Sequence, residues 1–278
     1  MPTTQQQPTT SSSSTDKQND TLPEISTLER LPNLAFYAVV LKLASKAEYV
    51  SGGGHGDILG VKNLDSNVEF VFSGVFQIAW NDFFFTPDAH FDPANLYNGH
   101  FSDIKLTCCL TQVKNDDFSF ATKHYSTVID NIRAFEKLAG VPNGANVIST
   151  IYEELGKPQI KIIHSLFEKK KEELDDDDDD DDERKEEGST DNSTNTLENI
   201  TPQFAMETWP VMERCRSELE DLLLTHDICP LEAYEEDSSR IPPQRHEARL
   251  KGTIVKVYLA FCHHNIKRQK KHIFQAVV

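Results

Sequence analysis

The sequence has no long apolar run. No stretch approaches the roughly eighteen consecutive apolar residues of a membrane-spanning helix. Met1–Asp20 is mostly Gln, Thr, Ser and Pro, without the basic start or apolar core of a secretory signal. We therefore expect a protein of the nucleus or cytoplasm that is neither secreted nor bound to a membrane.

Cysteine is scarce and follows no pattern. Five thiols are an odd number, and none forms the closely spaced pairs that hold zinc in small domains. This favours free thiols in a reducing compartment over a disulfide framework. No cofactor-binding motif is present, so no cofactor is expected.

Positive charge is also scarce, because 28 Lys and Arg face 45 Asp and Glu, a net charge of −17. The excess is local: Glu172–Glu187 holds thirteen acidic and two basic residues, a net −11, which leaves −6 elsewhere. Such a polyanion attracts a basic protein or polybasic segment, for example a histone. The predicted partner-binding residues are Asp175, Asp176, Asp177, Asp178, Asp179, Asp180, Asp181 and Asp182.

Composition divides the chain into four segments. Residues 1–28 read as a disordered polar tail, 29–168 as an α+β domain and 169–200 as a disordered acidic linker. Residues 201–278 carry a helix and a β-hairpin. These either complete the same domain or form a small second one.

Hydrophobic periodicity predicts an α+β fold, in which two or three helices cover a mainly antiparallel sheet. We expect strands over 34–43, 68–80, 100–113, 250–261 and 273–278, and helices over 120–138, 145–155 and 209–224.

The loop over 82–103 concentrates aromatic and titratable residues. His90, Asp92 and His100 are of the types that bind zinc, iron or manganese, and Asp88 is available as a base. One interpretation is a metal-dependent enzyme that activates water. The other is a long loop whose Asp and Asn residues cap turns and whose phenylalanines anchor it to the sheet.

The strongest basic cluster lies near the C-terminal end. Lys267, Arg268, Lys270 and Lys271 fall in CHHNIKRQKKH, which reads as an exposed hairpin connection close to Tyr258. Cations beside aromatic rings are typical of nucleic-acid contacts. The alternative is a solvated turn whose charge prevents aggregation, or an internal partner for the acidic segment.

No motif identifies a family or a reaction. The sequence favours a non-catalytic intracellular interaction protein whose acidic segment engages a basic partner. Two alternatives stay open: a nucleic-acid-binding module that uses the basic hairpin, and a metal enzyme centred on the 82–103 loop. Nothing in the sequence fixes the oligomeric state.

Overall fold

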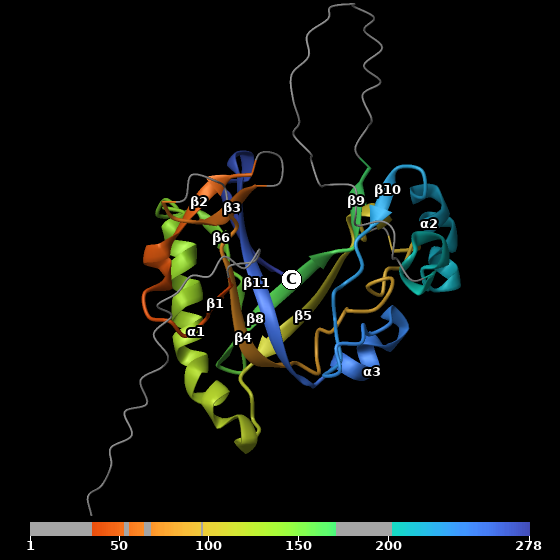
Figure 1. The fold of residues 1–278 in the computed structure, drawn as a ribbon. Coiled ribbons are helices and arrows are strands. Elements are labelled where there is room, and N and C mark those ends of the chain that lie inside the picture. The colour runs from red at the N-terminus through yellow and green to blue at the C-terminus, as the bar shows by residue number, and fades with distance from the viewer. Residues whose placement is uncertain (1–34, 53–55, 64–67, 96, 171–201) are drawn as a thin grey trace, which may run out of the picture. The chain divides into compact units, whose positions relative to one another are not determined.

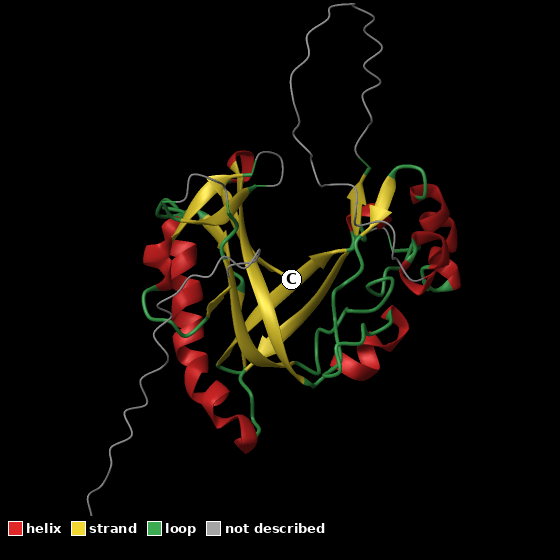
Figure 2. Ribbon diagram, viewed as in Figure 1, coloured by secondary structure: helices red, strands yellow, loops and turns green. Residues whose placement is uncertain are grey.

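A computed structural model describes residues 35–52, 56–63, 68–95, 97–170 and 202–278 (Figure 1). The structure contains both helices and strands and has a sheet-rich core, which agrees with an α+β fold (Figure 2). The helices are α1 (Ser119–Leu138), α2 (Arg216–Leu222) and α3 (His246–Leu250). The strands are β1 (Ala35–Tyr37), β2 (Ala47–Ser51), β3 (Asp57–Val61), β4 (Val71–Ile78), β5 (Lys105–Thr111), β6 (Asn146–Ile148), β7 (Ile151–Glu154), β8 (Lys157–Ser165), β9 (Phe167–Lys169), β10 (His226–Ile228), β11 (Ile254–Ile266) and β12 (Lys271–Val277).

Five of these strands pair in a closed ring. β4 pairs with β5, β5 with β8, β8 with β12, β12 with β11, and β11 returns to β4. The β8–β12 pairing is parallel, whereas the other four are antiparallel. Closure matters because it leaves no exposed strand edge within the ring. The chain therefore forms a five-stranded barrel.

The remaining strands extend this barrel. β1 pairs parallel with the start of β4, and β7 forms a hairpin with β8. The β2–β3 hairpin joins β11 at Cys262, and β6 joins the start of β12. β9 and β10 make a separate two-stranded sheet. As a result, the end of β11 lies between β3, which pairs with β2, and β12, which pairs with β6.

Helix α1 packs against the aromatic interior of the barrel. Phe135 contacts Phe72 of β4 and Phe261 of β11, with ring centroids 5.7 and 5.8 Å away. The Tyr125 hydroxyl donates to the carbonyl of Pro158 in β8 at 2.8 Å. Asn131 donates to the carbonyl of Ala38 at 2.7 Å. Helical spacing of apolar residues thus produces a helix with one buried face.

The helix predicted over 145–155 is wrong, because β6 and β7 occupy this range. Leu155 and Gly156 have φ of 51° and 73°, which gives the tight reversal of a two-residue hairpin between β7 and β8. The predicted helix over 209–224 is shorter than expected. Trp209 and Val211 are buried before α2 begins at Arg216.

The chain after the acidic segment returns to the loop between β4 and β5. The Trp209 indole donates to the carbonyl of Pro87 at 2.8 Å, and Arg214 donates to that of Phe91 at 2.9 Å. β11 and β12 then pair with β4 and β8, which precede that segment. Within the described ranges, no helix combines the length and apolar character needed to cross a bilayer.

Candidate nucleic-acid interface

The β11–β12 hairpin ends in a compact basic tip, which we define as Lys267, Arg268, Lys270 and Lys271. A 3₁₀ turn spans Lys267–Gln269, and Lys270 has a φ of 49° in the left-handed region. This region favours Gly or Asn, so a lysine there carries a backbone cost of about 1 kcal/mol. Lys267, Arg268 and Lys270 are exposed, and Lys271 is half-buried.

The tip is shorter than the sequence suggested. The predicted connection began at Cys262, but β11 continues to Ile266 and β12 begins at Lys271. His263, His264 and His272 therefore lie on strands. The basic residues are concentrated at the reversal itself, rather than spread along a long loop.

The tip cations have no acidic partner in the part of the chain that the structure describes. No carboxylate among the described residues lies within 4.0 Å of any of the four. Most other described lysines and arginines also lack such a partner, although Lys251 contacts Glu247 at 2.8 Å and Arg249 contacts Glu235 at 2.9 Å; what distinguishes the tip is that its four cations are close together in the sequence. Within the described residues, the charges of the tip are thus not neutralised by a neighbouring carboxylate.

Polar side chains continue from the tip across the outer face of the barrel. Alternation along β11 and β12 buries Phe261, His263 and Phe274 inside and turns the intervening side chains outward. His264 donates to Gln275 Oε1 at 3.3 Å, and Lys105 of β5 donates to the same oxygen at 3.5 Å. One polar network thus links β11, β12 and β5.

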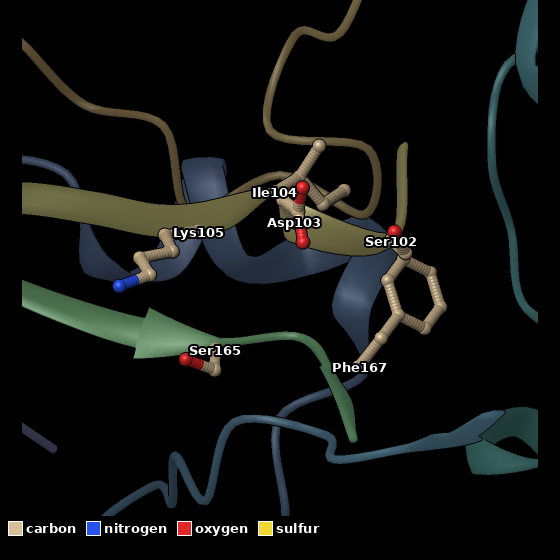
Figure 3. Close-up of a pocket in the computed structure, with 6 residues that line it drawn as sticks. All are labelled: Ser102, Asp103, Ile104, Lys105, Ser165 and Phe167. Atoms are coloured by element: carbon tan, nitrogen blue, oxygen red, sulfur yellow. The ribbon is translucent and has the colours of Figure 1, made fainter. Parts of the chain in front are cut away.

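An open hollow of about 340 Å³ lies beside Lys105, where β5 begins and β8 ends (Figure 3). The lysine ammonium and the Ser102 and Ser165 hydroxyls are groups that suit a phosphate, whereas the Asp103 carboxylate opposes one. Ile104 and Phe167 complete the lining. The hollow extends the outer polar face away from the tip.

A hydrogen-bonded chain of three side chains lies beneath the tip. His263 Nδ1 contacts Asp57 Oδ2 at 3.1 Å, and His263 Nε2 contacts His272 Nδ1 at 2.9 Å. Burial lowers the pKa of His263, while the Asp57 carboxylate opposes this shift. These hydrogen bonds join β3, β11 and β12, and so hold together the strands that carry the tip. Sequence reasoning missed it, although the strand alternation of β11 continues through His263.

The three candidate metal ligands do not form a cluster. His90, Asp92 and His100 are exposed, and Asp92 caps the backbone N–H of Ala94 at 3.1 Å. In the part of the chain that the structure describes, no three His, Cys, Asp or Glu side chains are arranged to hold a metal. The proposed base, Asp88, is buried and contacts Arg214 at 3.5 Å. The eight aspartates Asp175–Asp182 lie outside the described residues.

Comparison of the chain with protein-family models, with curated proteins and with solved structures gives no match. Topology, charge and exposed side chains are therefore the features that bear on its function.

Proposed function

We propose that this protein binds nucleic acid through the basic tip and the adjoining outer face of its barrel. The observation that supports this most strongly is the set of four cations on the β11–β12 connection, none of which pairs with a carboxylate of the described residues. A phosphate backbone supplies regularly spaced anions for such a cluster, and binding gains entropy as counterions leave the nucleic acid.

The strand order adds a second line of support. Five-stranded Greek-key barrels of the oligonucleotide/oligosaccharide-binding type close in the order 1-2-3-5-4-1 and bind ligands on strands 2 and 3 and on the loops 1–2 and 4–5. Here the ring strands in chain order are β4, β5, β8, β11 and β12. The tip is then the 4–5 loop, and Lys105 lies on strand 2. This is a likeness in topology, which hosts many functions.

The overall negative charge does not oppose the proposal. Glu172–Glu187 carries −11 of the −17. Charges in solution are screened over about 8 Å at physiological ionic strength, so the local charge at the tip decides its contacts. Exclusion of nucleic-acid binding on net charge alone is therefore unjustified.

The test uses a fluorescently labelled oligonucleotide and anisotropy at low salt. We expect Lys267→Gln, Arg268→Gln, Lys270→Gln and Lys271→Gln together to weaken binding roughly tenfold or more. The matched control replaces four exposed lysines outside the tip with Gln and so changes the net charge by the same amount. These lysines are Lys114, Lys123, Lys137 and Lys157. Equal affinities of the two variants would reject the tip as the binding site.

The other functions predicted from the sequence remain without structural support. Binding of a basic partner by Asp175–Asp182 depends on residues outside the described ranges and stays a prediction. A metal enzyme centred on His90, Asp92 and His100 is not favoured by the geometry, because these exposed side chains form no cluster.

A further inference from the structure

Two exposed aromatic rings, Trp80 and Tyr258, lie near or on β11, the strand that leads to the basic tip. Trp80 follows the end of β4 and is 68% exposed, and Tyr258 on β11 is 51% exposed. Large rings normally gain about 1.5–3 kcal/mol by burial. Exposure alone does not indicate a ligand, because Tyr97 is 97% exposed as well; what distinguishes Trp80 and Tyr258 is their position near or on β11, which leads to the basic tip.

The Trp80 indole is held in place although its surface is open. It lies against Gly252, just before β11: a Cβ atom there would come within 2.4 Å of Trp80 Cε2 and Cζ2. Gln77 Nε2 donates to the carbonyl of Gly252 at 3.1 Å and fixes this turn. The backbone supports the indole, and much of its surface stays free for a planar group.

The Tyr258 ring is held by a neighbouring cation. Lys256 lies two residues earlier on the same strand face, and its Nζ is 4.9 Å from the ring centroid. A cation over an aromatic face is attracted by the ring quadrupole, which restrains both side chains. Lys256 makes no ion pair with any described carboxylate within 4.0 Å. Tyr258 thus presents a half-exposed ring next to an ammonium group that pairs with no carboxylate of the described residues.

We propose that the ligand is single-stranded nucleic acid, whose unpaired bases stack on Tyr258 and Trp80 while its phosphates contact Lys256 and the basic tip. This inference rests on the proposed function and deepens it. A duplex satisfies phosphate contacts equally well, but its bases are already stacked on each other and cannot reach a side-chain ring. Aromatic platforms therefore favour unpaired strands, largely without regard to sequence.

The spacing of these groups along β11 fits one continuous strand of nucleic acid. From Gly252 to Lys267 the chain covers about 50 Å at ~3.3 Å per residue. Trp80 lies at one end of this line, Tyr258 and Lys256 lie between, and the tip closes the other end. A single five-stranded barrel of this type binds about 4–16 nucleotides. One copy of the protein is therefore enough to bind such a strand.

Intrinsic fluorescence tests the stacking directly. The chain has two tryptophans, and Trp209 is only 1% exposed. We expect oligothymidylate of about 15 nucleotides to quench the fluorescence of the full chain and of Trp209→Phe, but not that of Trp80→Phe. A duplex of equal length should leave the fluorescence unchanged. Equal quenching by both ligands would overturn the inference.

Affinity separates stacking from folding effects. Tyr258→Ala should weaken binding of the single strand about 5- to 150-fold, the range for one lost base stack. Tyr258→Phe should restore binding, since the ring is kept. Tyr97→Ala is the matched control, because Tyr97 is 97% exposed on the β4–β5 loop. Equal effects of Tyr258→Ala and Tyr97→Ala would contradict the stacking role.

The two proposals fail in different ways. If single strand and duplex bind equally and only the tip substitutions matter, phosphate binding stands and base stacking is refuted. If the tip substitutions also leave affinity unchanged, both proposals are refuted.

Discussion

His246, the first residue of α3, provides a pH-dependent test of the fold. Its side chain is 1% exposed, and its Nε2 donates to the carbonyl of Ile241 at 3.0 Å. Burial lowers the pKa of His246 to about 4, and the nearby Arg240 and His164 act in the same direction. The Ile241 carbonyl opposes the shift without cancelling it. The folded protein therefore keeps this histidine neutral.

The sign of the effect follows from the two pKa values. A histidine in the unfolded chain has a pKa near 6.5. Between that pH and the lower pKa of the folded state, the unfolded chain is protonated at His246 and the folded chain is not, which favours unfolding. Stability should fall between pH 6.5 and 4 and level off below. At ~1.4 kcal/mol per pKa unit, the protonation of His246 in the unfolded chain should lower the free energy of unfolding by roughly 2.5 kcal/mol at pH 4.5.

Urea unfolding at pH 7.5 and pH 4.5 measures this loss. His246→Gln keeps a side-chain N–H donor, now from an amide, but this side chain cannot be protonated in this pH range. Carboxylates and other histidines, including His263, contribute equally to both proteins, so the difference between them isolates His246. The reasoning is refuted if the original protein and His246→Gln lose the same free energy of unfolding over this range.

Three further predictions concern the packing of the chain and the acidic segment. Trp209→Ala should lower the free energy of unfolding in urea by about 3–5 kcal/mol, the range for a buried aromatic truncated to alanine; a loss below 1 kcal/mol would contradict its burial. Gly252→Ala should cost more than about 1 kcal/mol, because Gly252 has a φ of 77° and Trp80 leaves no space for a Cβ; thermal melting measures this, and an unchanged melting temperature would contradict it. Deletion of Glu172–Glu187 should tighten nucleic-acid binding in low-salt anisotropy, since a polyanion in the same chain competes for the tip; an unchanged affinity would contradict this competition.

Local periodicity predicted the elements whose burial pattern is regular. The apolar residues at helical spacing in 120–138 form α1, and the alternation in 68–80 and 100–113 forms β4 and β5. These segments needed no knowledge of their partners, because one face of each is consistently apolar.

The errors arose where distant partners decide the structure. Residues 146–154 form strands because β12 and β8 supply partners for their backbone groups, and a short apolar run does not specify this. His263 and His272 appeared to lie in an exposed turn, yet the pairing of β11 with β12 buries both.

The candidate sites, too, depend on contacts between distant parts of the chain that the sequence does not show. Asp88 was a possible base in an open loop, but Arg214 reaches it from beyond the acidic segment and makes it a buried ion-pair partner. The basic cluster was visible in the sequence. Its position at the end of β11 on a closed barrel depends on the long-range pairings of β11 with β4, β3 and β12, which the sequence does not show.

The most direct test of nucleic-acid binding by the tip is the salt dependence of the affinity. For single strands, the slope of log affinity against log salt is about −0.7 for each phosphate neutralised. If each tip cation contacts one phosphate, replacing Lys267, Arg268, Lys270 and Lys271 with Gln should make the slope shallower by nearly 3. The control variant at Lys114, Lys123, Lys137 and Lys157 should keep the original slope. An unchanged slope in the tip variant would contradict phosphate binding there.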